Sequence, residues 1–348
     1  MKKEVGVRGV RERRGACAVL LLSAALLTGC AKLGEPELIN VSYDPTREFY
    51  EEYNALFTEH WRQETGKHLE IIQSHGGSGA QALSVSQGLP ADVVTLALEA
   101  DVQAIAEEGL IDAGWIDEFP NDSAPYTSTI VFLVRKGNPK NVEDWDDLVR
   151  ADVGVITPNP KTSGGARWNF LAAWAWAQQE YGGSEARVKE YIEALYQNVL
   201  VLDSGARGAT TSFVENGQGD VLLTWENEGY LAMEEYPGEY ELVTPSVSIL
   251  CQPSVAVVDE VTRVNGTVRL ATEYINYLYS DEAQRLAAEY YYRPSNPEIL
   301  AAYGDRFDLN VELVTIEDFG GWTEAQAKFF AEGGVFDMIY ENMEPEED

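Results

Sequence analysis

Three turns rich in glycine and serine follow strand-like runs and precede helix-like runs, and they constrain the fold more than any other feature of this chain. They are Ser74–Gly79 (SHGGSG), Lys161–Trp168 (KTSGGARW) and Asp203–Thr210 (DSGARGAT). A turn at the start of a helix presents free backbone N–H groups at the positive end of the helix dipole, which suits an oxyanion. Three such turns predict that one anion is held from several sides.

The segments around these turns alternate between strand and helix patterns. The predicted strands are 38–42, 69–73, 93–98, 129–134, 153–157, 199–202, 221–224 and 254–258. The predicted helices are 44–66, 81–87, 101–108, 165–180, 185–197, 209–216, 268–279 and 282–292. We expect Asp44 to be the N-cap of the first helix and Gly66 to end it. This alternation predicts an α/β fold with parallel sheets and helices on their faces.

The order of these elements predicts two lobes. Residues 37–123 and 262–348 would form the first lobe, because the late helices return to it, and residues 124–261 would form an inserted second lobe joined by two hinge strands. The glycine-rich turns, Tyr43-Asp44 and Trp225 all come directly after strands. Ligands of α/β sheets bind at the carboxyl ends of strands. We therefore expect a ligand in the cleft between the lobes, enclosed when the lobes close.

The charge of the chain restricts its partners. It has 58 acidic and 25 basic residues among 348, for a formal net charge of -33. This excludes a general nucleic-acid binder and argues against a polybasic membrane patch. An anion site in such a chain must act through short-range hydrogen bonds. The repulsion between the anion and distant acidic residues is screened by salt over about 8–10 Å.

The N-terminus has the pattern of a targeting segment. A basic stretch, Lys2–Arg14, precedes a short apolar run, Ala16–Leu27, which ends in the lipobox-like sequence Leu27–Cys30. We expect a lipoprotein signal peptide over 1–29, a lipid on Cys30, a tether over 30–36 and an extracytoplasmic location. An ordinary secretory signal with an incidental cysteine is the alternative. Of the three cysteines, only Cys251 would then remain free, as a buried apolar side chain rather than a nucleophile.

Enzyme chemistry finds little support in the sequence. The three histidines show no nucleophile–base arrangement, and metal-ligand spacings such as C-x-x-C are absent. Carboxylates are plentiful, but the sequence does not show any two of them paired as glycoside hydrolysis would require. We predict no catalytic residue, no metal and no cofactor.

The same motifs resemble the sulfate-binding proteins of bacterial ABC importers. The matching stretches, between about Glu37 and Tyr340, are 40–45, SHGGSG, 122–139, 156–169, 202–210, 219–228 and 290–298. The resemblance implies a two-lobed periplasmic-binding-protein fold of type II with two crossover strands. It also implies a monomer that delivers sulfate to the transmembrane subunits of an ABC permease.

The resemblance further implies that neutral donors hold an unhydrated sulfate dianion. Carried onto this sequence, these donors are Ser78 and Ser163 through the backbone, the Ser163 hydroxyl, the backbone N–H groups of Gly164, Gly165 and Ala206, and the Trp225 indole. In the family, arginines such as Arg167 and Arg207 sit behind the binding peptides; direct contact with the ligand is the alternative. Asp44 would repel a dianion and His75 lacks suitable partners for a metal or base role, so we expect both to orient the turns. Without the resemblance, Trp225 would be interpreted as a core aromatic residue and the glycines as turn residues.

Two alternatives to sulfate import stay open. A thiosulfate-binding protein of the same importer class would share similar turns. An anion-sensing surface protein without a transporter would share the site but not the permease partner.

Overall fold

The computed structural model describes residues 36–343. The predicted signal peptide, Cys30 and nearly all of the predicted tether lie outside the described residues. Everything below concerns the compact unit that begins at Glu35.

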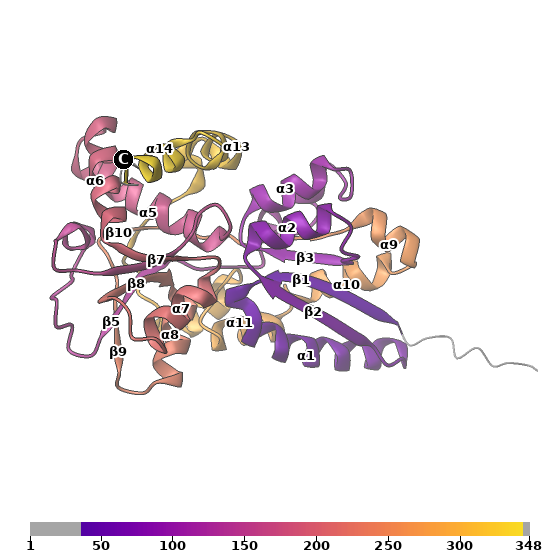
Figure 1. Cartoon of the computed structure of the whole chain (residues 1–348). Helices are drawn as coiled ribbons and strands as arrows, with labels where there is room; N and C mark the ends of the chain where they lie inside the picture. Colours follow the sequence, from indigo (N-terminus) through magenta and orange to yellow (C-terminus); the bar gives the residue numbers. More distant parts are fainter. Residues whose placement is uncertain (1–35, 344–348) are drawn as a thin grey trace, which may run out of the picture. The chain divides into compact units, whose positions relative to one another are not determined.

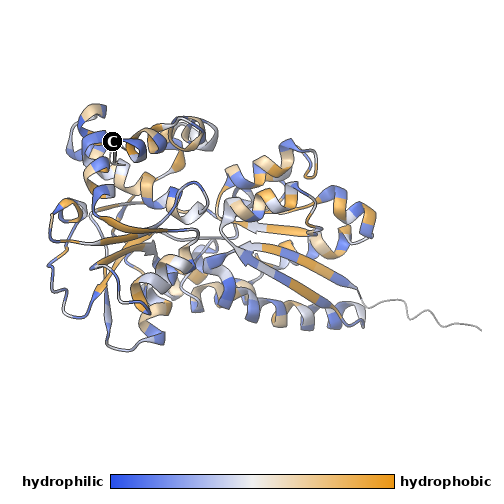
Figure 2. Ribbon diagram, viewed as in Figure 1, coloured by the Kyte–Doolittle hydropathy of each residue, from blue (hydrophilic) through white to orange (hydrophobic). Residues whose placement is uncertain are grey.

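One sheet contains four strands in the order β11-β3-β1-β2, with α1 on one face and α2 and α3 on the other (Figure 1). The strands are β1 (Glu37–Tyr43), β2 (Glu70–Gly76), β3 (Val93–Leu96) and β11 (Ser254–Val257). Both faces of β3 are buried: Val93 belongs to the core under α1, and Val94 to the core under α2 and α3. Such continuous burial is typical of a strand with helices on both sides, and Figure 2 shows the hydrophobic residues along these central strands.

A second sheet contains five strands in the order β7-β6-β8-β5-β9. The strands are β5 (Ile130–Arg135), β6 (Val155–Pro158), β7 (Val199–Asp203), β8 (Val221–Trp225) and β9 (Tyr240–Val243). β6 is parallel to β7 and β8, as predicted. The short strands β4 (Tyr126–Thr127), β10 (Val247–Ile249), β12 (Arg293–Pro294) and β13 (Glu312–Val314) form two further pairs.

The prediction of parallel sheets is wrong for the strands at the crossovers. β5 is antiparallel to β8, with Ile130 opposite Trp225, and β11 is antiparallel to β3, with Ser254 opposite Leu96. β5 begins beside the carboxyl end of β8, and β11 begins beside the carboxyl end of β3. A strand that begins there has to run in the opposite direction to its neighbour.

The two crossover segments are joined to each other. The Ser128 N–H donates to the Cys251 carbonyl at 3.0 Å, and the Cys251 N–H donates to the Ser128 carbonyl at 2.9 Å. The Cys251 thiol is free and fully buried at this bridge. Paired crossover segments between two α/β sheets agree with the predicted two-lobed fold.

Helices cover the faces of both sheets (Figure 1). Those that precede the second crossover are α1 (Arg47–Thr65), α2 (Ser78–Ser86), α3 (Glu99–Glu107), α4 (Pro120–Ser123), α5 (Gly164–Glu180), α6 (Glu185–Gln197), α7 (Ala206–Val214) and α8 (Glu226–Glu235). Those that follow it are α9 (Asp259–Asn265), α10 (Val268–Tyr277), α11 (Asp281–Glu289), α12 (Pro297–Ala302), α13 (Gly321–Ala325) and α14 (Val335–Met343). Across residues 36–343 we find no helix with the length and apolarity needed to cross a membrane.

The start of the first helix differs from the prediction. Asp44 is not its N-cap: Asp44–Thr46 forms a 3-10 turn, and α1 begins at Arg47. Pro45 has no N–H to donate and a fixed φ, so it fits this tight first turn. Gly66 ends α1 in the left-handed conformation at φ 70°, as predicted.

The last helices pack against elements of the second sheet's layer. α14 contacts α6, and the rings of Phe329 and Trp174 lie 4.8 Å apart. The Lys161 ammonium pairs with the Asp337 carboxylate at 2.8 Å. The predicted lobe boundaries stay a prediction. The strand pairs β12–β4 and β13–β10, and the segment from α13 onward, join residues of 262–348 to residues of the predicted second lobe.

Candidate anion-binding site

The residues predicted to hold an anion come together at the carboxyl ends of β1, β2 and β6. The cavity there is small, with a volume of about 10 Å³. Its lining residues are Tyr43, Asp44, Pro45, Gly76, Gly77, Ser78, Ser163, Gly164, Gly165 and Ala206. Five of the six predicted ligand residues are in this set, and no lysine or arginine is among the described residues that line the cavity.

Three helices begin at this cavity. Ser78 is the first residue of α2, Gly164 and Gly165 are the first two of α5, and Ala206 is the first of α7. The first N–H groups of a helix have no partner within the helix. The three glycine-rich turns therefore aim free donors and the positive ends of three helix dipoles at one point.

Trp225 adds a donor that has no partner. It ends β8, its ring is 1% exposed, and its indole N–H is buried without a hydrogen bond. A Cβ atom placed on Gly165 would lie 3.1 Å from the indole nitrogen, so this donor faces the start of α5. A buried polar group left unpaired costs about 1–3 kcal/mol, so the indole N–H is a sign of an acceptor that belongs there.

The Ser163 hydroxyl, rather than its backbone N–H, is free to donate into the cavity. Its backbone N–H already donates to the Asn159 carbonyl at 2.9 Å, which corrects the prediction of a backbone contact. Its hydroxyl oxygen accepts from the Ala166 N–H at 3.3 Å as the N-cap of α5. A hydroxyl that accepts one hydrogen bond still has its proton to donate.

Gly77 allows the turns to approach each other. A Cβ atom on Gly77 would lie 2.6 Å from the Thr162 carbonyl oxygen and 3.0 Å from that of Ser204. Only glycine fits where three backbone segments meet so closely. The sequence indicated the glycine-rich turn but not this contact.

The Ser78 hydroxyl and Arg167 belong to a buried network beside the cavity. The Ser78 hydroxyl donates to Asp101 at 2.5 Å and accepts from the Ala97 N–H at 3.0 Å. Arg167 pairs with Asp101 at 3.1 Å and donates to the Pro160 carbonyl at 2.9 Å. The Ser78 hydroxyl is thus occupied, which leaves its backbone N–H for a ligand. Arg167 is not among the residues that line the cavity, and its predicted role of orienting the turns stays a prediction.

The other three predicted supporting residues, Asp44, His75 and Arg207, differ in how close they lie to the cavity. Asp44 lines the cavity, where burial raises the pKa of its carboxyl and the nearby Arg47 and Arg207 oppose that rise. Burial lowers the pKa of His75 to about 4, so its ring is neutral at pH 7, and Nδ1 lies 3.4 Å from the Tyr43 carbonyl oxygen. Arg207 faces away from the cavity and pairs with Glu48.

Comparison with known proteins identifies the family of this site. Residues 39–293 match the model of the family described as bacterial extracellular solute-binding protein. The chain belongs to this family. Its members are extracytoplasmic binding proteins rather than enzymes, and no group of His, Cys, Asp or Glu within residues 36–343 is arranged to hold a metal ion.

Three relatives of this solute-binding protein carry names that specify an anion. The sulfate-binding protein of Escherichia coli (strain K12) is 58% identical over 305 residues, 87% of this chain and 92% of that one. A thiosulfate-binding protein of Pseudomonas aeruginosa is 48% identical over 93% of this chain and 97% of that one. The solved structure of the sulfate-binding protein SubI from Mycobacterium tuberculosis superposes with a TM-score of 0.76 at 33% identity, over 85% of this chain and 99% of that one. The predicted type II fold and the predicted family are confirmed.

Several residues of the site were not among the predicted ligand or supporting residues. Tyr43, Pro45 and Gly76 line the cavity, although Tyr43 and Gly76 lie in segments predicted to meet the ligand, and Asp101 joins Ser78 to Arg167. Tyr43 and Pro45 flank the predicted Asp44, so their place after β1 was a usable signal. Asp101 is one of many acidic residues on predicted helices, and nothing local distinguishes it.

Proposed function

We propose that this solute-binding protein binds sulfate outside the cytoplasm and delivers it to an ABC importer. The observation that carries the proposal is the buried, unpaired indole N–H of Trp225 beside the free N–H groups of Gly164, Gly165 and Ala206. A site of donors without a lysine or arginine suits a fully ionised oxyanion held by hydrogen bonds of roughly 1.5–3 kcal/mol each. The 58% identity to a protein named for sulfate supports this anion over others.

In this proposal the six predicted ligand residues hold the anion, with Ser163 acting through its hydroxyl. Asp44, His75, Arg167 and Arg207 orient the turns around it. We assign residues 37–123 and part of 262–348 to one lobe and 124–261 to the other, hinged at the Ser128–Cys251 bridge. Closure of the lobes brings Gly77 against Thr162 and buries the ligand.

Thiosulfate is the second candidate ligand, because a relative with 48% identity is named for it. Calorimetry of the mature protein with sulfate, thiosulfate and molybdate tests the assignment. We expect sulfate to bind tightest with one site per chain. Thiosulfate binding tenfold tighter than sulfate would make this a thiosulfate receptor, and saturable binding of neither would overturn the proposal.

Transport is tested separately from binding. We expect deletion of the gene to slow growth on sulfate as the sole sulfur source, with rescue by the intact gene. Normal growth of the deletion strain, in a strain with no second sulfate receptor, would favour an anion sensor without a transporter.

We also propose that Cys30 carries a lipid anchor and that the mature protein is a monomer. Bacterial anchoring needs more than one acyl chain for stable attachment, and a tether holds the receptor at high local concentration near its permease. Membrane fractionation of cells with the parent and Cys30→Ser proteins tests the anchor. Equal membrane retention of both, or release of the parent, would contradict it, and light scattering of the released domain tests the monomer.

A further inference from the structure

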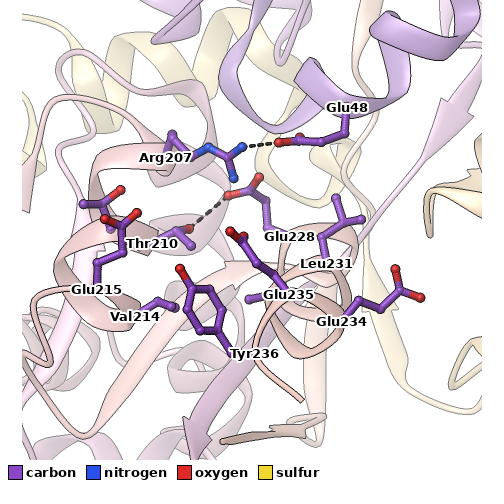
Figure 3. A pocket seen from close by; sticks show the side chains of 12 residues that line it. Glu48, Arg207, Thr210, Val214, Glu215, Glu228, Leu231, Glu234, Glu235 and Tyr236 are labelled. Carbon is purple, nitrogen blue, oxygen red and sulfur yellow. Dashed lines mark hydrogen bonds and ion pairs between the residues drawn. The ribbon is translucent and has the colours of Figure 1, made fainter.

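A second, larger pocket lies between α7 and α8 on the far side of the Arg207 turn (Figure 3). It is lined by five carboxylates, those of Glu48, Glu215, Glu228, Glu234 and Glu235, and by one guanidinium, that of Arg207. Arg207 already pairs with Glu48. One guanidinium therefore faces five carboxylates in this lining, and its charge also acts on Glu228 and Glu235.

Glu228 is the residue that points to a ligand. It is 3% exposed, and Thr210 donates to its Oε2 at 3.0 Å, but its Oε1 is buried without any hydrogen-bond partner. Figure 3 shows its carboxylate directed toward the middle of the pocket, between Arg207 and Glu235. Protonation alone does not explain this oxygen, because a proton on Oε1 would have no acceptor and a proton on Oε2 would leave Oε1 unpaired. A donor from outside the chain resolves it.

The chemistry of the pocket favours an organic ammonium over a metal ion. Metal cations need several oxygens converging at about 2.0–2.6 Å, and no group of three or more acidic, His or Cys residues within the described part of the chain could hold one. The wall also includes Val214, Leu231 and Ala232, which offer apolar contact to a methylene chain. Ammonium groups joined by methylene groups match both features.

Glu228 and Glu235 lie on one face of α8. They are seven residues apart, which is close to two turns of the helix. Two carboxylates on one face suit a ligand with two ammonium groups joined by a short chain of methylene groups.

We propose that this pocket is a second binding site, which takes an aliphatic diamine with one ammonium on Glu228 and the other on Glu235. Burial raises the pKa of Glu228 to about 7, with Arg207 acting in the opposite direction, and a bound ammonium would lower that pKa again. Binding at pH 7 therefore releases protons from Glu228. The site is separate from the anion cavity, and its test does not depend on which anion binds there.

Calorimetry of the mature protein with 1,4-diaminobutane tests the site, with 1-aminobutane and magnesium chloride as comparison probes. We expect one diamine per chain, binding at least tenfold tighter than the monoamine and with proton release at pH 7. Magnesium at the same concentration should not displace the diamine. Displacement by magnesium, or no saturable diamine binding, would show only diffuse attraction to an acidic surface and would overturn the proposal.

Three variants locate the ligand. Glu228→Gln should weaken diamine binding at least tenfold and remove the proton release. Glu235→Gln should lower the affinity for the diamine to that for the monoamine, and it should leave the affinity for the monoamine unchanged. Glu190→Gln removes the same charge from an exposed position on α6 and should change nothing. Equal weakening by all three variants would contradict a defined site.

Discussion

The anion cavity and the α7–α8 pocket lie beside the same turn, Ser204–Gly208, and they differ in which hydrogen-bonding group is left unpaired. Beside the anion cavity, next to Gly165, the buried indole of Trp225 is a donor without an acceptor, and at the α7–α8 pocket the buried Oε1 of Glu228 is an acceptor without a donor. Ala206 lines the first hollow and its neighbour Arg207 lines the second. One turn of chain thus separates a site with unused N–H groups from a site with unused carboxylate oxygens.

The contrast explains how a protein with a net charge of -33 can bind a dianion. The donors of the anion cavity are backbone and neutral side-chain groups fixed by the fold, and they act only over hydrogen-bond distance. The carboxylates of the neighbouring pocket lie on the other side of the same turn, so they raise the cost of binding an anion unless a cation or a proton compensates their charge. The two regions are best tested as a pair.

Gly77→Ala should have the largest effect on the anion cavity. The new methyl carbon would lie 2.6 Å from the Thr162 carbonyl oxygen, so the turns would have to separate. Loss of two or more charge-assisted bonds should lower sulfate affinity by at least ~100-fold. Gly114→Ala is the control, because no atom lies within 4 Å of its Cβ position. Calorimetry that finds Gly77→Ala within threefold of the parent would contradict the close approach of the turns.

Trp225→Phe should have the next largest effect, because it removes one donor and keeps an aromatic ring. We expect sulfate affinity to fall by about 2 kcal/mol, roughly thirtyfold. Trp61→Phe removes another buried, unpaired indole N–H, one on α1, whereas the indole nitrogen of Trp225 faces Gly165 at the start of α5. It should leave the affinity unchanged. Similar losses in both variants would mean that the indole of Trp225 only packs.

Glu228→Gln should stabilise the ligand-free protein, and only above about pH 5. The pKa of Glu228 rises from 4.5 to about 7 on folding, so the native state binds more protons than the unfolded state between these values, and stability falls as pH rises through them. We expect the free energy of unfolding of the variant to exceed that of the parent by about 2 kcal/mol at pH 8 and by almost nothing at pH 4.5. A shift of one pKa unit corresponds to about 1.4 kcal/mol, and part of that gain is offset because the glutamine amide also costs free energy to bury. Urea denaturation at the two pH values measures this. A gain that does not depend on pH would show that charge on Glu228 is not the cause.

Ser163→Ala should have the smallest effect on binding and a separate effect on stability. It removes one hydroxyl donor, about 1.5 kcal/mol of binding or roughly tenfold, and the N-cap of α5, about 1 kcal/mol of stability. Ser280→Ala removes the equivalent N-cap of α11, where the Ser280 hydroxyl accepts from the Ala283 N–H at 3.2 Å. The control should lose the stability and keep the affinity. Equal affinity in both variants would remove the Ser163 hydroxyl from the site.

Much of the anion cavity could be predicted from the sequence, and none of the α7–α8 pocket was. Glycine-rich turns between strand and helix patterns have a local physical signal, so the first turns of α2, α5 and α7 were placed within a few residues. The antiparallel direction of β5 and β11 depends on which edge each strand enters, which is a property of the whole fold. Glu48 and Glu228 lie on different helices of a chain with many glutamates, and only the fold brings them together around Arg207.

The most direct test of the central claim is calorimetric titration of the mature protein with sulfate and with phosphate at pH 7. Sulfate is fully ionised and matches a site whose ligand-facing groups we assign as donors. Phosphate keeps a proton. The one carboxylate in the lining, that of Asp44, is assigned to orienting the turns, so this proton would have no acceptor when buried, and an unmatched polar group of this kind reduces binding by about 10⁴–10⁵. We predict tight sulfate binding and phosphate binding weaker by at least ~1000-fold. Phosphate binding within about tenfold of sulfate, a difference of ~1.4 kcal/mol or less, would contradict a donor-only site.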